Sequence, residues 1–242
     1  SRKDVYKDKP FKPGENVIYE VSYAGVLAGH GAMEVRQPVK YQDAWHQQFH
    51  GEAKTGDWYR LVFVLHDKLE AVSRPWDFGI SRFYMEQDEG KMFSKRYVRK
   101  KWLEFIHNEC KVKETTWDPD KGEDKKEFTL QYGANDAFGA VYYLRTLKYK
   151  VGEKQKALIY TSEQNWWLEV DPVALEKVTV PSGTYDAYKL KLQTYLGKEL
   201  QQKGDVYVWI AESPERQLVQ VQGDVKIGSI WVKMAKYQAG TP

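Results

Sequence analysis

Apolar and polar residues alternate along most of this chain with a period of two. After Glu15, the apolar residues Val17, Tyr19, Val21 and Tyr23 are separated by single residues that are mostly polar. A period of two places successive side chains on opposite faces of an extended strand. This segment is therefore predicted to be a β-strand with one buried face.

Similar stretches follow one another through the first half of the chain, separated by residues that favour turns. A return strand is predicted over 30–36 and is expected to end at Pro38, because proline has no amide hydrogen to donate to a neighbouring strand. A hairpin turn is predicted at 88–90, where two acidic residues precede a glycine. The pattern indicates a meander of antiparallel strands, with further members over 44–54, 58–66, 69–73, 80–87 and 92–98.

The later part of the chain continues this organisation. Residues 99–126 are heavily charged and contain a strong turn signal at 117–122, so a long exposed hairpin is predicted there. Strands resume after Gly152, and residues 188–196 alternate with particular clarity after a tight turn at 181–184, where Gly183 is free to adopt a positive φ. Near the end, the apolar residues shift from odd to even positions, which predicts a β-bulge at 228–229.

One segment, 135–147, has the spacing of a helix instead. Asn135 or Asp136 can accept hydrogen bonds from the free amides of the first turn, and apolar residues follow at helical intervals. Such a helix can cover the open end or concave face of a curved sheet, or link two β halves. We therefore predict an all-β, mainly antiparallel fold, a curved sheet or an open β-barrel-like structure with one central helix.

The predicted domain organisation is simple. Residues 1–12 are polar and are expected to form a flexible segment, and residues 13–242 are expected to form one β-rich domain. Within that domain, the halves 13–133 and 150–242 are joined by the helix. Arg145 is a charged residue on an otherwise apolar helix, so we expect its guanidinium to anchor the helix by reaching a buried carboxylate such as Asp136 or Asp67. Recognition of a ligand by Arg145 is the alternative.

Composition narrows the classes of function. The chain has 242 residues, of which 42% are hydrophobic and 14% aromatic, enough to offset the entropy cost of ordering. The net charge of +3 supplies no overall field for a nucleic acid or an anionic membrane, so any such contact has to be local. No apolar run is long enough to span a bilayer as a helix. The single cysteine excludes an internal disulfide. The polar start suggests a mature or trimmed chain whose export signal has been removed.

Several landmarks cover most of the chain, and their order and spacing are informative: Pro13, Gly14, Glu15, Tyr19, Tyr23, Gly25, Ala28, Gly29, Tyr142, Tyr143, Leu144, Arg145, Val151, Gly152, Val180, Pro181, Ser182, Gly183, Thr184, Tyr185, Trp209, Ile227, Gly228 and Ser229. In this order and spacing they resemble a known family of bacterial exported proteins, the domain-of-unknown-function 3108 (DUF3108) family. The resemblance implies a curved all-β fold and a periplasmic or outer-membrane-associated location. It implies no established activity, and it leaves open whether a lipid anchor precedes Ser1.

No recognisable catalytic motif is present. Phosphate-binding glycine loops, serine-nucleophile elbows and metalloprotease helices are absent from the sequence. Glycan hydrolysis needs two carboxylates around a bound sugar, and the candidates are Asp67, Glu70, Asp77 and Glu86. His46 and His50 lie on one predicted strand face, but their spacing matches no metal-ligand motif, and the surroundings of Cys110 do not favour a nucleophile. We therefore expect no metal, no cofactor and no catalysis.

The excess of aromatic residues, with nine tryptophans and seventeen tyrosines, is the most informative feature of the composition. An exposed ring can stack on a sugar or contact an acyl chain, whereas a buried ring fills the core. We predict an exported, non-catalytic envelope protein that binds an apolar or glycan ligand, or a protein partner, through Trp58, Trp76, Tyr143 and Trp167. An envelope glycan hydrolase and a structural component of an envelope complex are the alternatives.

Overall fold

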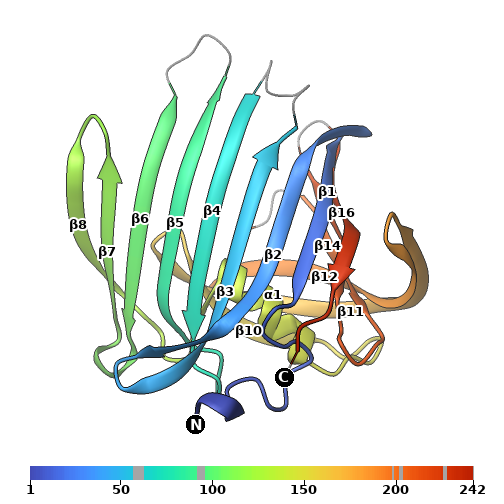
Figure 1. Ribbon diagram of the computed structural model, residues 1–242, viewed down its shortest axis with the longest axis horizontal. Coiled ribbons are helices and arrows are strands. Elements are labelled where there is room, and N and C mark those ends of the chain that lie inside the picture. Colours follow the sequence, from blue (N-terminus) through green and yellow to red (C-terminus); the bar gives the residue numbers. More distant parts are fainter. Residues whose placement is uncertain (57–62, 92–95, 198, 202–203, 226–227, 242) are drawn as a thin grey trace.

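A single curved sheet wrapped around one α-helix forms this protein (Figure 1). The computed structural model describes residues 1–56, 63–91, 96–197, 199–201, 204–225 and 228–241. Within these ranges sixteen strands share one sheet, and all neighbouring strands are antiparallel except the short pair β9–β10. The sheet does not close, because β8 and β9 are its two ends. The predicted all-β class and open, curved architecture are confirmed.

The elements of the described ranges follow one another as a meander interrupted once by the helix. They are η1 (Arg2–Asp4), β1 (Asn16–Tyr23), β2 (Val26–Tyr41), β3 (Ala44–Thr55), β4 (Phe63–Ser73), β5 (Ile80–Lys91), β6 (Tyr97–Ile106), η3 (His107–Glu109), β7 (Lys111–Asp118), β8 (Gly122–Thr129), β9 (Asn135–Asp136), α1 (Ala137–Thr146), β10 (Gln155–Thr161), β11 (Gln164–Val180), β12 (Gly183–Leu196), β13 (Glu199–Leu200), β14 (Val206–Ala211), β15 (Leu218–Asp224) and β16 (Ser229–Gln238). No helix in the described ranges combines the length and the hydropathy that crossing a bilayer requires.

The two halves of the chain meet through its first and last strands. The sheet order runs from β8 back to β1, continues through β16 and ends at β9, with β13 paired to the side of β12. Residues near the two ends of the chain are therefore cross-strand partners, as in the pair Val21 and Val232. The predicted hairpin turns at 117–122 and 181–184 join β7 to β8 and β11 to β12, as expected.

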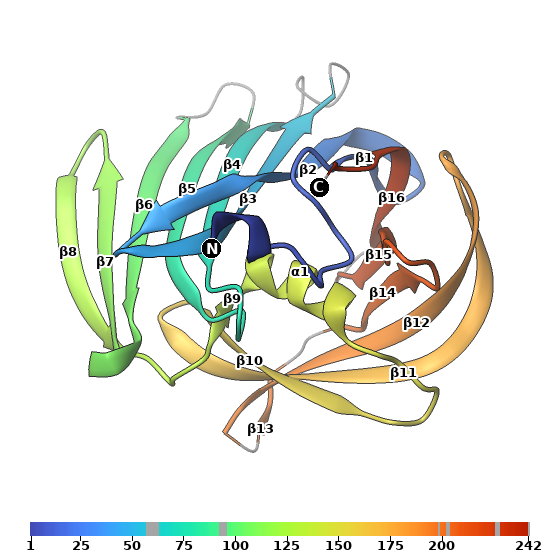
Figure 2. The same cartoon turned by 60° about the horizontal axis from the view of Figure 1, so that its bottom comes forward.

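Helix α1 lies on the concave side of the sheet and contacts both halves of the core (Figure 2). Tyr142 packs with the core of the first half, whereas Ala140 and Leu144 pack with the second. Asp136 is the residue that caps the helix, because its Oδ1 accepts hydrogen bonds from the amides of Phe138 and Gly139 at 2.9 Å each. The cap satisfies two of the amides that the first turn leaves unpaired.

Glycine at position 51 allows the helix to approach the sheet closely. A Cβ atom built on Gly51 would lie 2.9 Å from the ring of Phe138. Such a distance is shorter than van der Waals contact, so any larger side chain would push α1 away from β3.

Several predicted strand boundaries are wrong. Strand β2 does not end at Pro38 but continues to Tyr41, because a register shift between Arg36 and Val39 places the proline in a bulge, where no donor is needed. The turn predicted at 88–90 is strand, since β5 continues to Lys91. The segments predicted at 58–66 and 69–73 belong to one strand, β4, as far as the described residues 63–73 show. Of the strand predicted at 92–98, residues 97 and 98 form the start of β6, and residues 92–95 lie outside the described ranges.

The apolar phase shift near the end of the chain also has a different cause from the one predicted. Asp224 of β15 pairs with Ser229 of β16 without a register shift, so the described residues Gly228 and Ser229 lie where the two strands are connected and do not form a bulge. Gly228 has a φ of 81°, a left-handed conformation that glycine adopts without strain. The bulge in this region lies further along β16, opposite Ile18 and Tyr19 of β1.

Residues 1–12, predicted from their polar composition to form a flexible segment, contribute three side chains to the core. Val5, Tyr6 and Phe11 are buried, and the three side chains pack with the core of the first half. Their spacing in sequence follows neither a strand nor a helix, so periodicity could not identify them as core residues. The segment therefore belongs to the folded domain.

Candidate functional site

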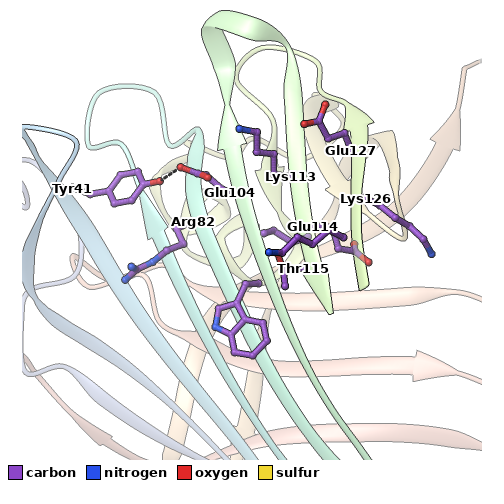
Figure 3. A pocket seen from close by; sticks show the side chains of 11 residues that line it. Tyr41, Arg82, Glu104, Lys113, Glu114, Thr115, Lys126 and Glu127 are labelled. Carbon is purple, nitrogen blue, oxygen red and sulfur yellow. Dashed lines mark hydrogen bonds between the residues drawn. The ribbon is translucent and has the colours of Figure 1, made fainter. Parts of the chain in front are cut away.

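A polar pocket of about 760 Å³ lies over β5, β6, β7 and β8, beside the end of the β2–β3 hairpin (Figure 3). Strand alternation explains how its floor is built. Leu103 and Phe105 of β6 are buried in the core, so the intervening Glu104 and the preceding Trp102 face outward. The pocket is lined by Tyr41, Arg82, Trp102, Leu103, Glu104, Lys113, Glu114, Thr115, Lys125, Lys126 and Glu127.

A hydrogen bond ties the hairpin end to the pocket floor. The Tyr41 hydroxyl donates to Oε1 of Glu104 at 3.0 Å, and Figure 3 shows the two side chains directed toward each other. Arg82 lies on β5, beside the strand β6 that carries Glu104. Its guanidinium is 5.7 Å from the ring centre of Tyr41. Burial and then the bond to Glu104 raise the pKa of Tyr41 to about 12. The phenol is therefore neutral at physiological pH and remains a donor.

Trp102, which lines the pocket, is one of three aromatic side chains that share the outer face of β5–β7. Tyr84 on β5 and Trp102 on β6 are direct cross-strand partners, with ring centres 5.4 Å apart. Trp117 on β7 follows diagonally, and the ammonium of Lys100 lies 5.7 Å from its ring centre. Trp102 is 38% exposed and Trp117 is 36% exposed. We call Tyr84, Trp102 and Trp117 the aromatic strip.

Charges of both signs line the pocket and limit its chemistry. Glu104 is held by Tyr41, and the buried Glu114 accepts a hydrogen bond from Lys101 at 2.9 Å. Neither a histidine nor a cysteine is among the lining residues. The pocket therefore offers hydrogen-bond donors, acceptors and an indole ring, which can hold a polar ligand.

Of the aromatic residues predicted to bind a ligand, the three that the structure describes lie in different places. Trp58 lies outside the described residues. Trp76 is on the connection between β4 and β5 and is 63% exposed, whereas the half-buried Tyr143 of α1 packs against Phe78 with ring centres 5.6 Å apart. Trp167 of β11 is exposed and lines a separate pocket of about 440 Å³ with Lys156, Glu169, Tyr195 and Gly197. Ligand binding by these residues stays a prediction.

Sequence reasoning missed Trp102 and Glu104, although a signal for both exists. Lys100, Trp102 and Glu104 occupy alternate positions in a charged stretch and therefore share the wet face of a strand. Tyr41, by contrast, precedes Glu104 by 63 residues, and only the folded hairpin brings it to the pocket.

Arg145 is an anchor with a different partner from those predicted. Its Nη1 and Nη2 atoms donate to the two carboxylate oxygens of Glu15 at 2.6 and 2.8 Å. Nε and Nη2 also donate to the carbonyls of Arg216 and Glu215. Asp136 caps α1 instead, and Asp67 accepts from the amide of Asp88 at 3.3 Å. Arg145 therefore connects α1 to the segment before β1 and to the connection between β14 and β15.

Asp67 differs from the other hydrolase candidates in two ways. It lies beside a second acid, Glu89, and within the described residues no cation forms an ion pair with Asp67. Burial, followed by the charge of Glu89, raises the pKa of Asp67 to about 6. The other candidates each contact a cation: Glu70 binds Arg36, Asp77 binds Arg74, and Glu86 lies 4.0 Å from Lys100.

This raised pKa predicts how stability changes with pH. In the unfolded chain Asp67 loses its proton near pH 4, but in the folded chain it keeps the proton up to about pH 6. Because the folded chain binds the proton more tightly, the contribution of Asp67 to the free energy of unfolding decreases as the pH rises from about 4 to about 6. An Asp67→Asn variant, which resembles the protonated form, is expected to show a smaller decrease in the free energy of unfolding from pH 4 to pH 7. Urea denaturation at each pH measures this, with the exposed Asp43→Asn as the control. Equal slopes for Asp67→Asn and the wild type would contradict the assignment.

The two histidines considered as metal ligands do not form a site. The His46 Nδ1 is 3.1 Å from the carbonyl of Ala44, and the His50 Nδ1 is 4.0 Å from Glu70. In the part of the chain that the structure describes, no group of three or more histidine, cysteine, aspartate or glutamate side chains is placed to hold a metal ion.

Comparisons with known proteins give a family and a fold. The model of a family described as "Protein of unknown function (DUF3108)" matches residues 18–235. No curated protein matches the sequence. Among solved structures, the chain is similar to a β-barrel-like protein of the domain of unknown function DUF1849 from Brucella abortus, with a TM-score of 0.54 and 10% identity, covering 96% of this chain and 99% of that chain. That likeness supports the unclosed, β-barrel-like fold.

Two further solved structures are more distant. One is a candidate exported protein with a YmcC-like fold from Bacteroides fragilis, with a TM-score of 0.41 and 12% identity over 95% of this chain and 98% of that one. The other is a candidate lipoprotein from Parabacteroides distasonis, with a TM-score of 0.36 and 13% identity over 96% of this chain and 99% of that one.

Proposed function

This chain belongs to the DUF3108 family, and on that basis we propose that it is an exported, non-catalytic envelope protein that binds a glycan in the pocket over β5–β8. The observation that carries the proposal is the aromatic strip beside a pocket lined by charges of both signs. The location outside the cytoplasm rests on the resemblance of the chain to a family of exported proteins.

The chemistry of the pocket favours a glycan over an apolar ligand. An acyl chain would remove water from Arg82, Lys113 and the other lining charges without offering them hydrogen bonds, which is costly. Sugar hydroxyls can replace that water, since each both donates and accepts. The C–H face of a sugar ring can at the same time stack on the exposed indole of Trp102.

Removing the indole of Trp102 tests the proposal. A Trp102→Ala variant is expected to bind its glycan about tenfold more weakly, because loss of a stacking contact worth about 1.4 kcal/mol corresponds to that factor. The probes are peptidoglycan fragments and lipopolysaccharide core oligosaccharides, titrated while intrinsic tryptophan fluorescence is followed. Trp167→Ala, which removes another exposed indole on β11, is the matched control and is expected to keep the wild-type affinity.

Two results would overturn the glycan-binding proposal. One is the absence of a saturable fluorescence change with any of these glycans at millimolar concentration. The other is an equal loss of affinity in Trp102→Ala and Trp167→Ala, which would remove the pocket as the site.

A glycan hydrolase is the second candidate function, and the pair formed by Asp67 and Glu89 favours it. Burial, followed by the charge of Glu89, raises the pKa of Asp67 to about 6, so Asp67 can hold a proton at mildly acidic pH and donate it as a general acid. Release of reducing ends from the same glycans, abolished in Asp67→Asn, would support hydrolysis. Binding without release of reducing ends would support the non-catalytic function.

A further inference from the structure

A second pocket, of about 580 Å³, lies where the amino-terminal segment crosses the bulge of β2. It is lined by four basic residues and four uncharged ones: Arg2, Lys3, Lys7, Lys12, Tyr6, Pro13, Gln37 and Pro38. No acidic residue is among them, whereas the pocket over β5–β8 mixes both charges. Asp4, an acid of the same segment, is engaged by the hydroxyl of Ser1 at 2.6 Å. The pocket is therefore suited to an anion.

Contacts with the rest of the protein hold two of these cationic side chains, Lys12 and Arg2, in position. The ammonium of Lys12 donates to the carbonyls of Tyr6 and Lys7 at 2.5 and 2.8 Å, which leaves its third hydrogen for a ligand. The guanidinium of Arg2 lies 5.6 Å from the ring centre of Trp45. The hydroxyl of the buried Tyr6 donates to the carbonyl of Arg36 on β2. Because the segment is held against the sheet, its basic side chains project from a defined surface.

Exposed aromatic residues lie at the same end of the molecule. Trp76 is 63% exposed and Tyr132 is 64% exposed, and the guanidinium of Arg74 lies 6.0 and 5.0 Å from their ring centres. The His46 ring is 6.2 Å from that of Trp76.

The amino-terminal segment and the β4–β5 connection also touch directly. The ammonium of Lys9 lies 4.5 Å from the ring centre of Phe78. Figure 2, in which this end of the molecule comes forward, shows the amino-terminal segment and η1 lying across the lower end of the sheet. We call this end the basal surface and define it by Arg2, Lys3, Lys7, Trp76 and Tyr132. Arg74 itself is buried and paired with Asp77 at 2.7 Å.

We propose that the basal surface docks on a membrane that contains anionic phospholipids, with a headgroup phosphate bound in the basic pocket. Lysine and arginine residues are attracted to the negative potential of such a membrane, and each contributes separately. Tryptophan and tyrosine prefer the headgroup region, where the ring leaves water while its polar atom stays hydrated. A soluble phosphate compound would use the cations but would not need the exposed rings of Trp76 and Tyr132. This proposal uses different residues from the glycan pocket.

Vesicle flotation tests the docking surface. The full chain is mixed with phosphatidylcholine vesicles that either contain or lack phosphatidylglycerol, at low and at high salt. Binding is expected only to the anionic vesicles and is expected to weaken at high salt, because salt screens the attraction. A Lys3→Glu/Lys7→Glu variant is expected to lose at least about tenfold in affinity for the anionic vesicles.

The matched control carries the same change in net charge at another surface. Lys150→Glu/Lys177→Glu alters two exposed lysines outside the basal surface and is expected to change vesicle affinity less than about twofold. A Trp76→Ala variant is expected to bind the vesicles more weakly while melting like the wild type, because its ring is exposed.

Three results would overturn the proposal: equal losses in the two lysine variants, absence of binding to the anionic vesicles, or binding of free inorganic phosphate in calorimetry without binding of vesicles. The Lys3→Glu/Lys7→Glu variant is also titrated with the glycans that test the proposed function and is expected to keep its response to them. Failure of membrane docking can therefore be told apart from failure of glycan binding.

Discussion

Replacing Arg145 by methionine is expected to lower the free energy of unfolding by about 3–5 kcal/mol, because it leaves the buried carboxylate of Glu15 without its cation. Arg145 is 2% exposed and Glu15 is 1% exposed, and two hydrogen bonds join them. The hydroxyl of Tyr237 on β16 donates to the same carboxylate at 3.3 Å. The change therefore affects α1, the segment before β1 and the last strand together. Urea denaturation followed by tryptophan fluorescence measures it.

Two further variants separate the buried ion pair from a general effect of losing an arginine. Arg36→Met removes a partly exposed arginine that pairs with Glu34 and Glu70, and is expected to cost about 0–1 kcal/mol. The double variant Arg145→Met/Glu15→Met removes both buried charges and is expected to be more stable than Arg145→Met alone. If Arg145→Met and Arg36→Met had equal effects, the pair would not be the anchor described above.

Phe11→Ala is expected to destabilise the protein by about 3–5 kcal/mol, the usual range for removing a fully buried phenylalanine. Phe11 is 1% exposed although it lies in a segment of mostly polar residues. Its ring centre is 5.6 Å from that of Phe49 and 5.3 Å from that of Tyr142, and the guanidinium of Arg145 lies 5.1 Å away. Thermal and urea denaturation of the full chain measure the effect.

Trp76→Ala is the control for Phe11→Ala. It removes a larger ring, but one that is 63% exposed, and the expected change in the free energy of unfolding is within about 0.5 kcal/mol. If Phe11→Ala also changed the free energy of unfolding by no more than about 0.5 kcal/mol, residues 1–12 would not be part of the core.

Much of the fold could be predicted from local pattern. Alternation along 16–23 and 188–196 identified strands because a pleated strand with one buried face requires that period. The helix over 137–146 was found within two residues of its ends, because Asp136 and the following apolar spacing are signals carried by neighbouring residues. The end of β2 was predicted wrongly, because Pro38, a residue type that usually ends a strand, is tolerated in a bulge.

The candidate sites depended on contacts between residues far apart in the sequence. Arg145 could be recognised as an anchor because a charge on an apolar helix must find a partner, but Glu15 lies 130 residues away and no spacing rule connects them. Tyr41 reaches Glu104 only because the β2–β3 hairpin extends to the pocket over β5–β8. Tyr132 becomes a neighbour of Arg74 only in the folded chain.

Sequence alone is sufficient for the strand-rich class and for helix α1 of this protein, because these follow from the period of side chains. It narrows the cap to Asn135 or Asp136, and the hydrogen bonds of the folded helix identify Asp136. The curvature of the sheet decides the rest. It determines which carboxylate pairs with Arg145, how Phe11 becomes buried and which rings surround a pocket. Curvature and register bring strands together across more than a hundred residues, so these contacts arise only when the whole sheet is assembled.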